Sequence, residues 1–193
     1  METNSLAVWI SRLSWLVCAS VIVNPWCHAL PQEAQILLQM KESFKDDPYN
    51  ALDNWMLDRD LDSADAPCDW DGITCANSTG MVIEITLEDK SLNGPLYYGL
   101  CNLLSLEKLH MGFNDLYGIL PPSLMNCSSL QSLNLTTNSL SGTLPDFSGL
   151  KSLKILDLTT NNFIGQFPAS LPAFFFFVMD SLLFENVCCK LFP

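Results

Sequence analysis

Residues 130–145, LQSLNLTTNSLSGTLP, carry the pattern that decides the fold. Two further stretches repeat this pattern in register: residues 106–121, LEKLHMGFNDLYGILP, and residues 153–168, LKILDLTTNNFIGQFP. A weaker copy, ITLEDKSLNGPL, occupies residues 85–96. The asparagines at the shared position lie 24 and 23 residues apart: Asn114, Asn138 and Asn161. This period predicts a solenoid of stacked units, because one unit cannot bury its apolar edge alone.

Each unit predicts a short strand followed by a tight turn. Two leucines spaced two apart, such as Leu133 and Leu135, alternate with period 2 and therefore point to the same inner face. A buried asparagine at the turn can donate and accept hydrogen bonds, which satisfies backbone groups that the turn leaves unpaired. The glycine that follows permits a conformation closed to residues with a β-carbon, and the proline ends strand pairing. Lys90 replaces the asparagine in the weaker copy and has no acceptor, so we expect a looser first turn.

The composition favours one folded domain. The chain has 193 residues, of which 49% are hydrophobic and 16% charged, and this balance is typical of a packed core. The net charge of −12 argues against nucleic acid and anionic membranes, which both attract basic surfaces. Asp58, Asp60 and Asp62 have part of the spacing of a calcium loop. No turn glycine or distal glutamate follows them, so a solvated acidic loop is favoured.

The N-terminus has the pattern of a secretory signal peptide, residues 1–29. Arg12 precedes an apolar run over residues 13–23, and Cys27-His28-Ala29 offers a cleavage site. The run is shorter than the roughly 20 residues that a membrane span needs, and Pro25 further disfavours an uncleaved anchor. We therefore expect a secreted or cell-surface chain.

Secretion makes disulfides credible. Six cysteines follow residue 29, and Cys68 and Cys75 lie close together in the sequence. A zinc site needs four ligands and the only later histidine is His110, so a disulfide between Cys68 and Cys75 is favoured over a metal. The remaining pairing stays open: Cys101, Cys127, Cys188 and Cys189. Three sequons predict glycosylation on a secreted surface: Asn77, Asn126 and Asn134.

The segment before the repeats completes a family likeness. Residues 31–44 predict a helix with an apolar face of Ile36, Leu37, Met40 and Phe44, and residues 67–75 read PCDWDGITC. This arrangement, together with the Leu-Gly-Leu-Pro order after each asparagine, resembles the N-terminal cap and plant-type repeats of plant leucine-rich-repeat receptor-like kinases. Residues 134–153 look most like the early repeats of receptors for secreted peptide hormones, in particular receptors for C-terminally encoded peptides.

The resemblance implies an α/β solenoid with a helical, disulfide-closed cap. The expected divisions are a cap over residues 30–80, about four plant-type repeats over residues 81–171, and an off-pattern hydrophobic tail over residues 172–193. The tail lacks the length of a membrane span and the layout of a lipid-anchor signal, and no kinase signature appears. The expected chain is a truncated receptor-like product, and the alternative is a short secreted protein whose tail caps the last repeat.

The predicted function is extracellular recognition of a protein or secreted peptide, without catalysis or cofactor. Relatives grip a peptide carboxylate with an arginine pair in later repeats, whereas Arg59 is the only arginine after residue 29. The alternative is a small co-receptor-like partner or an inhibitor of a cell-wall-degrading enzyme. The candidate binding positions are the outward residues of the concave strand face: Glu84, Thr86, Glu88, Lys108, His110, Gly112, Ser132, Asn134, Thr136, Ile155, Asp157 and Thr159.

Overall fold

The computed structural model describes residues 32–56, 67–166 and 168. The chain divides into two compact units, residues 1–30 and 31–193, and all described residues lie in the second. Several predictions fall outside the described residues: the signal peptide, the Asp58–Asp62 acidic loop with Arg59, and the tail with Cys188 and Cys189.

The cap begins with helix α2, Gln32–Ser43, in which Ile36, Leu37 and Met40 are buried as the sequence predicts. Phe44, which we expected on the same helical face, follows the last residue of the helix and is half-buried. Glu33 ties this helix to the first long strand, because its Oε2 accepts a hydrogen bond from the backbone N–H of Val82 at 2.9 Å. At the other end of the helix, the Lys41 ammonium donates to the carbonyls of Leu52 and Trp55 at 2.5 and 3.1 Å. These bonds fix the helix against the loop that follows it.

Two tryptophans build the rest of the cap. Trp55 and Trp70 stack with ring centroids 5.6 Å apart, and both are almost fully buried. The Trp55 indole donates to the carbonyl of Asp71 at 2.9 Å. A disulfide joins Cys68 to Cys75 beside this pair. The cap thus has its own apolar centre, continuous with the repeat core.

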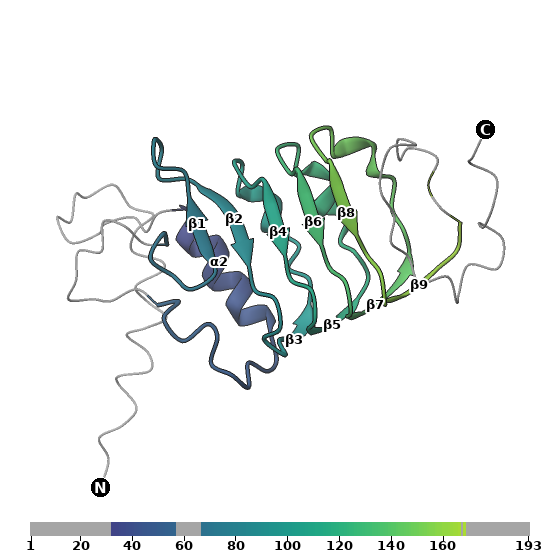
Figure 1. Ribbon diagram of the computed structural model, residues 1–193, viewed down its shortest axis with the longest axis horizontal. Coiled ribbons are helices and arrows are strands. Elements are labelled where there is room, and N and C mark those ends of the chain that lie inside the picture. The colour runs from purple at the N-terminus through teal and green to yellow at the C-terminus, as the bar shows by residue number, and fades with distance from the viewer. Residues whose placement is uncertain (1–31, 57–66, 167, 169–193) are drawn as a thin grey trace, which may run out of the picture. The chain divides into compact units, whose positions relative to one another are not determined.

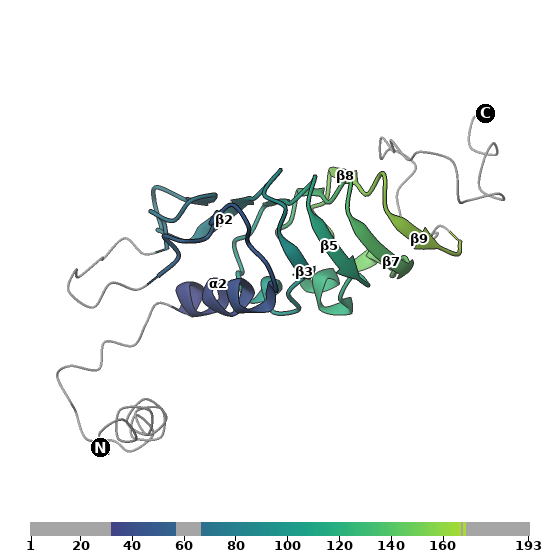
Figure 2. The same ribbon diagram turned by 90° about the horizontal axis from the view of Figure 1, so that it is seen from below.

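Two sheets run along the solenoid (Figure 1 and Figure 2). The larger sheet has the order β1-β2-β4-β6-β8, in which β1 is antiparallel and the others are parallel. Its strands are β1 Ile73–Cys75, β2 Val82–Thr86, β4 Lys108–His110, β6 Ser132–Asn134 and β8 Ile155–Asp157. The smaller sheet contains β3 Asn93–Pro95, β5 Asp115–Gly118, β7 Ser139–Thr143 and β9 Asn162–Ile164. The predicted leucine-rich-repeat solenoid is confirmed.

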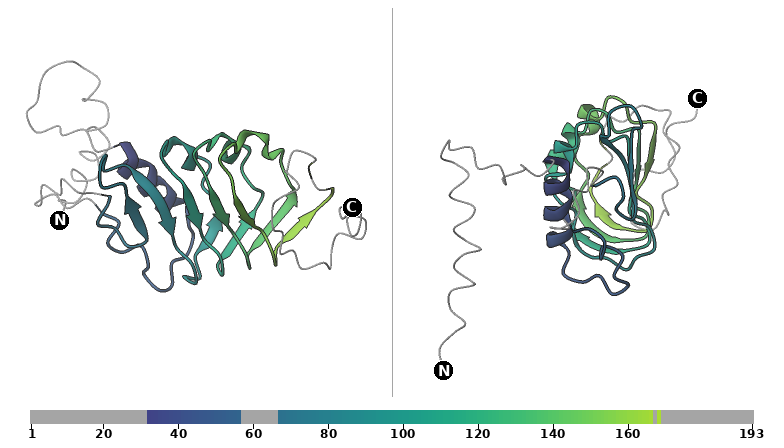
Figure 3. Two further views of the ribbon diagram at one scale, coloured as in Figure 1. Left: turned by 45° about the horizontal axis from the view of Figure 1, so that its top comes forward. Right: turned by 90° about the vertical axis from the view of Figure 1, so that its left-hand side faces the viewer.

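Short 3-10 helices close each coil on the side away from the five-stranded sheet (Figure 3, right). They are η1 Leu100–Asn102, η2 Pro122–Asn126 and η3 Phe147–Gly149. Equivalent leucines pair in register across the five-stranded sheet, Leu109 with Leu133 and Leu133 with Leu156, and all three are at most 1% exposed. Each unit therefore buries its leucines against those of its neighbours.

The repeat asparagines link each turn to the unit before it. Asn138 donates to Leu135 and Thr136 in its own turn and to Met111 in the previous unit, at 3.0–3.2 Å. Its Oδ1 accepts from the N–H of Leu116 at 2.9 Å. Asn114 and Asn161 make the same kinds of bond. One side chain thus satisfies backbone groups of two units.

The first turn differs from the later ones. Asp89 and Ser91, which flank Lys90, both have positive φ, whereas each later turn has one such residue: Phe113, Thr137 or Thr160. Asn114 Oδ1 accepts from the backbone N–H of both Lys90 and Leu92. The turn that we expected to be looser is therefore held by the asparagine of the next unit.

The repeat glycines serve two different needs. Gly118, Gly142 and Gly165 have φ of +85°, +84° and +90°, the left-handed conformation that glycine adopts most easily. Gly94 does not share this conformation. A β-carbon there would lie 2.9 Å from the Phe44 Cα and from the Ser43 carbonyl oxygen, so this glycine allows the end of α2 to approach β3.

Candidate recognition face

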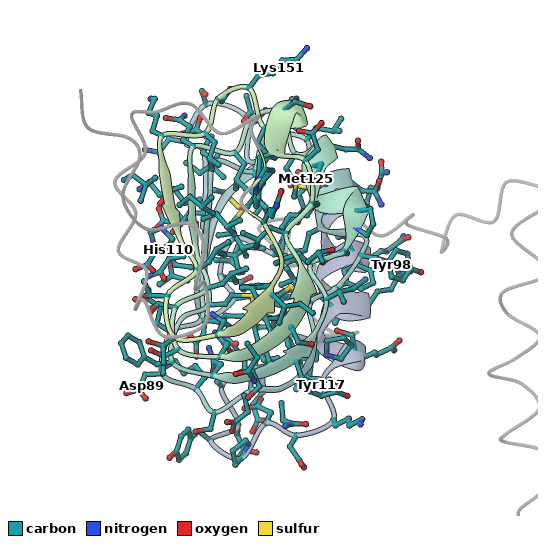
Figure 4. All side chains as sticks on the ribbon, turned by 90° about the vertical axis from the view of Figure 1, so that its right-hand side faces the viewer. Asp89, Tyr98, His110, Tyr117, Met125 and Lys151 are labelled. Atoms are coloured by element: carbon teal, nitrogen blue, oxygen red, sulfur yellow. A yellow bond between two sulfur atoms is a disulfide. The ribbon has the colours of Figure 1, made fainter. Side chains whose placement is uncertain are left out.

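The strand face is the outer surface formed by the outward side chains of β2, β4, β6 and β8 and of the residues that directly follow them. Strand register aligns these side chains in two rows across the sheet. The first row is Glu84, Lys108, Ser132 and Ile155, and the second is Thr86, His110, Asn134 and Asp157. Figure 4 places His110 on this side of the solenoid and Tyr98 and Met125 on the opposite side.

An ion pair begins the first row. The Lys108 ammonium lies 3.0 Å from Glu84 Oε2, and the Thr86 hydroxyl donates to Glu84 Oε1 at 3.1 Å. The hydrogen bond from Lys108 is the main cause that holds the pKa of Glu84 below its ordinary value, against a smaller opposing effect of burial. Glu84 is therefore charged at neutral pH and prealigned toward β4.

Polar pairs extend this alignment across the face. His110 Nε2 lies 2.8 Å from the Ser132 hydroxyl oxygen. Asn134 donates to Glu88 Oε1 at 2.8 Å, and its own Oδ1 accepts from the backbone N–H of Thr136 at 3.0 Å. Both ends of the Asn134 amide are thus engaged within the face.

Four predicted positions are less accessible than we expected. Ser132, Thr136 and Thr159 are 6%, 9% and 8% exposed, and Gly112 is buried as well. The hydroxyls of Thr136 and Thr159 lie 2.6 Å apart, and the Thr159 hydroxyl also donates to Asp157 at 2.7 Å. Small side chains at this spacing are covered by their neighbours, so they join adjacent strands and offer little surface to a ligand.

The accessible part of the strand face is consequently narrower than the predicted set. Its members are Glu84, Thr86, Glu88, Lys108, His110, Asn134, Ile155 and Asp157. Ile155 is 59% exposed. Among the described residues of the strand face, it is the one large apolar side chain that is exposed. A ligand would meet an apolar contact at β8 beside a polar, mostly acidic surface.

The sequons differ in their surroundings. Asn77 lies exposed in the turn between β1 and β2, and Asn126 lies exposed at the end of η2. Asn134 is half-buried in the strand face.

The structure also contains a disulfide between Cys101 and Cys127, a pairing that sequence reasoning left open. The two cysteines are 26 residues apart, close to one repeat, and this spacing was the available signal that they lie on stacked units.

The described residues show neither a membrane-spanning helix nor a metal site. In residues 32–56, 67–166 and 168, no helix is long and apolar enough to cross a bilayer. Over the same ranges, no group of three or more His, Cys, Asp or Glu side chains is placed to hold a metal ion.

Comparison with known proteins agrees with this geometry. Residues 30–76 match the leucine rich repeat N-terminal domain, and residues 104–163 match the leucine rich repeat. The chain belongs to the leucine-rich-repeat proteins with an N-terminal cap. More particularly, its relatives are plant receptor-like kinases and receptor-like proteins.

Three similarities illustrate the range. Receptor-like protein kinase 7 of Arabidopsis thaliana is 43% identical over 122 residues, which cover 63% of this chain and 12% of the kinase. The ectodomain of the Arabidopsis receptor kinase HAESA, solved with a peptide hormone ligand, is 33% identical with a TM-score of 0.62, over 72% of this chain and 22% of that one. The BIR2 ectodomain from Arabidopsis thaliana is 27% identical with a TM-score of 0.54, over 77% and 93%.

These proportions set the scale of the likeness. The chain spans about an eighth of the receptor kinase and about a fifth of the HAESA ectodomain, but nearly all of the BIR2 ectodomain. The particular likeness to receptors for C-terminally encoded peptides remains a prediction from sequence.

Proposed function

We propose that this chain is a non-catalytic extracellular recognition module whose strand face binds a protein or a secreted peptide. The observation that carries the proposal is the register of the strand face. Outward side chains on adjacent strands repeat about every 4.8 Å, so a ligand lying across the strands meets one side chain per repeat. Glu84, Lys108 and Ile155 already lie in one such row.

Internal bonds support this assignment by reducing the cost of binding. Lys108 is held by Glu84, and Asn134 is held by Glu88. Side chains that are already ordered lose less conformational freedom when a ligand binds. Exposed Ile155 supplies the apolar contact that commonly anchors an interface within a polar rim.

A co-receptor-like role is the second candidate, and the low number of cationic side chains on the strand face favours it. The match covers 93% of the BIR2 ectodomain, so the BIR2 ectodomain is built from about as many repeats as the matched part of this chain. No arginine occurs among the described residues, and a strand face with few lysines binds a peptide carboxylate weakly. A protein partner therefore suits the face better than a free peptide alone.

One binding experiment separates the two candidates. The secreted chain is immobilised and tested against purified plant receptor-kinase ectodomains, with and without their peptide ligands, and against the peptides alone. Capture of an ectodomain supports the co-receptor-like role, and capture of a free peptide supports direct peptide recognition. If none of the ectodomains or peptides is retained above a heat-denatured control, the proposed recognition function is wrong.

A further inference from the structure

The sequon at Asn126 has a disulfide inside it. Cys127 lies between the acceptor Asn126 and the hydroxyl residue Ser128, and its sulfur is bonded to Cys101. Cys127 is 5% exposed, whereas Asn126 and Ser128 on either side of it are exposed. The middle of the sequon is therefore fixed in the fold while its two reactive ends face solvent.

The backbone of this sequon is also folded back on itself. The Cys127 N–H donates to the Leu124 carbonyl at 3.2 Å, and the Ser128 N–H donates to the Asn126 carbonyl at 2.8 Å. A transferring enzyme has to bind the Asn126 amide and the Ser128 hydroxyl together, and in this turn the backbone fixes their relative placement. The disulfide prevents the turn from rearranging to suit the enzyme, because it ties Cys127 to η1.

The sequon at Asn77 provides a contrast within the same chain. Asn77, Ser78 and Thr79 are all exposed in the turn between β1 and β2, and none of the three is covalently bonded to another part of the chain. The Cys68–Cys75 disulfide ends two residues before Asn77, and the Thr79 N–H donates to the Ala76 carbonyl at 3.2 Å, but no disulfide lies inside this sequon.

We propose that closure of the Cys101–Cys127 disulfide ends glycan transfer to Asn126, so that the glycan is added before the disulfide forms or not at all. This inference rests on the proposed extracellular placement. In one reaction, the two thiols lose two protons and two electrons to a protein disulfide, which is reduced to a dithiol. In the other, the Asn126 amide nitrogen forms a bond to the first sugar carbon of a lipid-pyrophosphate oligosaccharide. The lipid pyrophosphate leaves, and the nitrogen loses a proton.

The two reactions compete in time as well as in geometry. Chains are synthesised at about 5–20 residues per second, so Cys127 follows Cys101 within roughly 1–5 s. Disulfide formation takes seconds to hours, depending on the oxidant. A more oxidising compartment therefore yields more molecules with a bare Asn126.

This competition gives the protein two covalent forms that differ on the side bearing the 3-10 helices. The Ser123 hydroxyl of η2 donates to the Tyr98 carbonyl at 2.5 Å, and the Tyr98 side chain is 72% exposed. A glycan at Asn126 would cover part of this surface, whereas the disulfide-first form leaves it open. The strand face, on the opposite side (Figure 4), is unchanged in either form.

Site occupancy measured by mass spectrometry tests the proposal. The full chain is expressed in plant cells as the wild type, as Cys101→Ser and as Cys68→Ser, and the secreted protein is enzymatically deglycosylated in ¹⁸O water. Cys101→Ser keeps the Asn126 sequon intact, and Cys68→Ser opens the other disulfide as a matched control. We expect partial occupancy of Asn126 in the wild type, a rise on the order of twofold in Cys101→Ser, and no rise in Cys68→Ser.

A second measurement covers the case in which Cys101→Ser is not secreted. The wild-type chain is translated in vitro with microsomes, with and without a reductant, and the reductant is expected to raise occupancy of Asn126 while that of Asn77 stays constant. Equal occupancy of Asn126 in all samples, with Asn77 occupied, overturns the inference alone. Absence of the chain from the medium, together with no glycan at any sequon after translation with microsomes, contradicts the extracellular placement on which the inference rests.

Discussion

Replacing Asn114 with alanine should destabilise the junction between the first two repeats more than any surface substitution. Asn114 is 7% exposed, and its Oδ1 accepts from the backbone N–H groups of Lys90 and Leu92 at 3.1 and 3.0 Å. Its amide donates to three carbonyls, those of Leu87, Met111 and Gly112, at 2.7–3.1 Å. Alanine leaves both N–H donors without this acceptor.

The magnitude follows from these two donors. A buried donor left unpaired, such as the Leu92 N–H, costs about 1–3 kcal/mol, and the half-buried Lys90 N–H costs less because water can reach it. The carbonyls can find partial compensation through their second lone pairs. We expect Asn114→Ala to lower the free energy of unfolding by about 2–4 kcal/mol, a large share of the roughly 5–15 kcal/mol of a typical domain. Asn138 Oδ1 accepts from one backbone N–H, that of Leu116, so Asn138→Ala should cost less.

Urea denaturation of the secreted protein, followed by far-ultraviolet circular dichroism, measures the effect. A loss of this size lowers the urea midpoint by about 2 M, given a typical slope of 1–3 kcal/mol per molar. Asn162→Ala is the matched control, because Asn162 is exposed in β9 and its loss should change stability by less than about 0.5 kcal/mol. If Asn114→Ala costs no more than Asn162→Ala, the asparagines do not hold the repeats together.

Three further outcomes follow from the same contacts. Gly94→Ala should lower the melting temperature and the free energy of unfolding, the latter by about 1–3 kcal/mol, because the new β-carbon would lie 2.9 Å from the backbone at the end of α2. An unchanged melting temperature in calorimetry would contradict this. Lys108→Gln should lower stability by less than about 1 kcal/mol, since the pair is partly exposed. The folded-state pKa of Glu84 is depressed, so the stability difference between the wild type and Lys108→Gln should have its largest value at pH above the unfolded-state pKa of Glu84. The difference should disappear as pH falls through the folded-state pKa, and denaturation at several pH values measures this. Cys101→Ser should cost about 3–4 kcal/mol and Cys68→Ser about 2–3 kcal/mol, because the closed loops span 26 and 7 residues, and denaturation of both variants checks the order.

The repeat architecture is visible in the sequence because its causes are local and recur. The spacing of Leu133, Leu135 and Asn138 specifies a strand and a turn, and repetition of that spacing specifies stacking. The first turn shows where local reasoning fails. Lys90 carries no acceptor, but the acceptor comes from Asn114 on the next unit, and the sequence of one unit contains no trace of it.

The sequence correctly predicts where the strand face lies, but it predicts only part of which side chains on that face are exposed. Alternation correctly places Ser132 and Thr136 outside the leucine core, yet both are buried by neighbours on adjacent strands. Exposure there depends on the sizes of side chains about 4.8 Å away, on units that lie 23 or 24 residues away in the sequence. The Cys101–Cys127 bond has the same origin, since contact between stacked units brings the two cysteines together.

The most direct test of the strand face as the recognition surface compares two exposed isoleucines. Ile155 lies in β8 on the strand face and is 59% exposed, and Ile164 lies in β9 on the other sheet and is 58% exposed. The affinity of Ile155→Arg and Ile164→Arg is measured for the ectodomain or peptide that the wild-type chain captures. We predict that Ile155→Arg weakens binding at least tenfold, about 1.4 kcal/mol, and that Ile164→Arg leaves it unchanged. Equal affinity of Ile155→Arg and the wild type, or a loss confined to Ile164→Arg, would contradict the assignment.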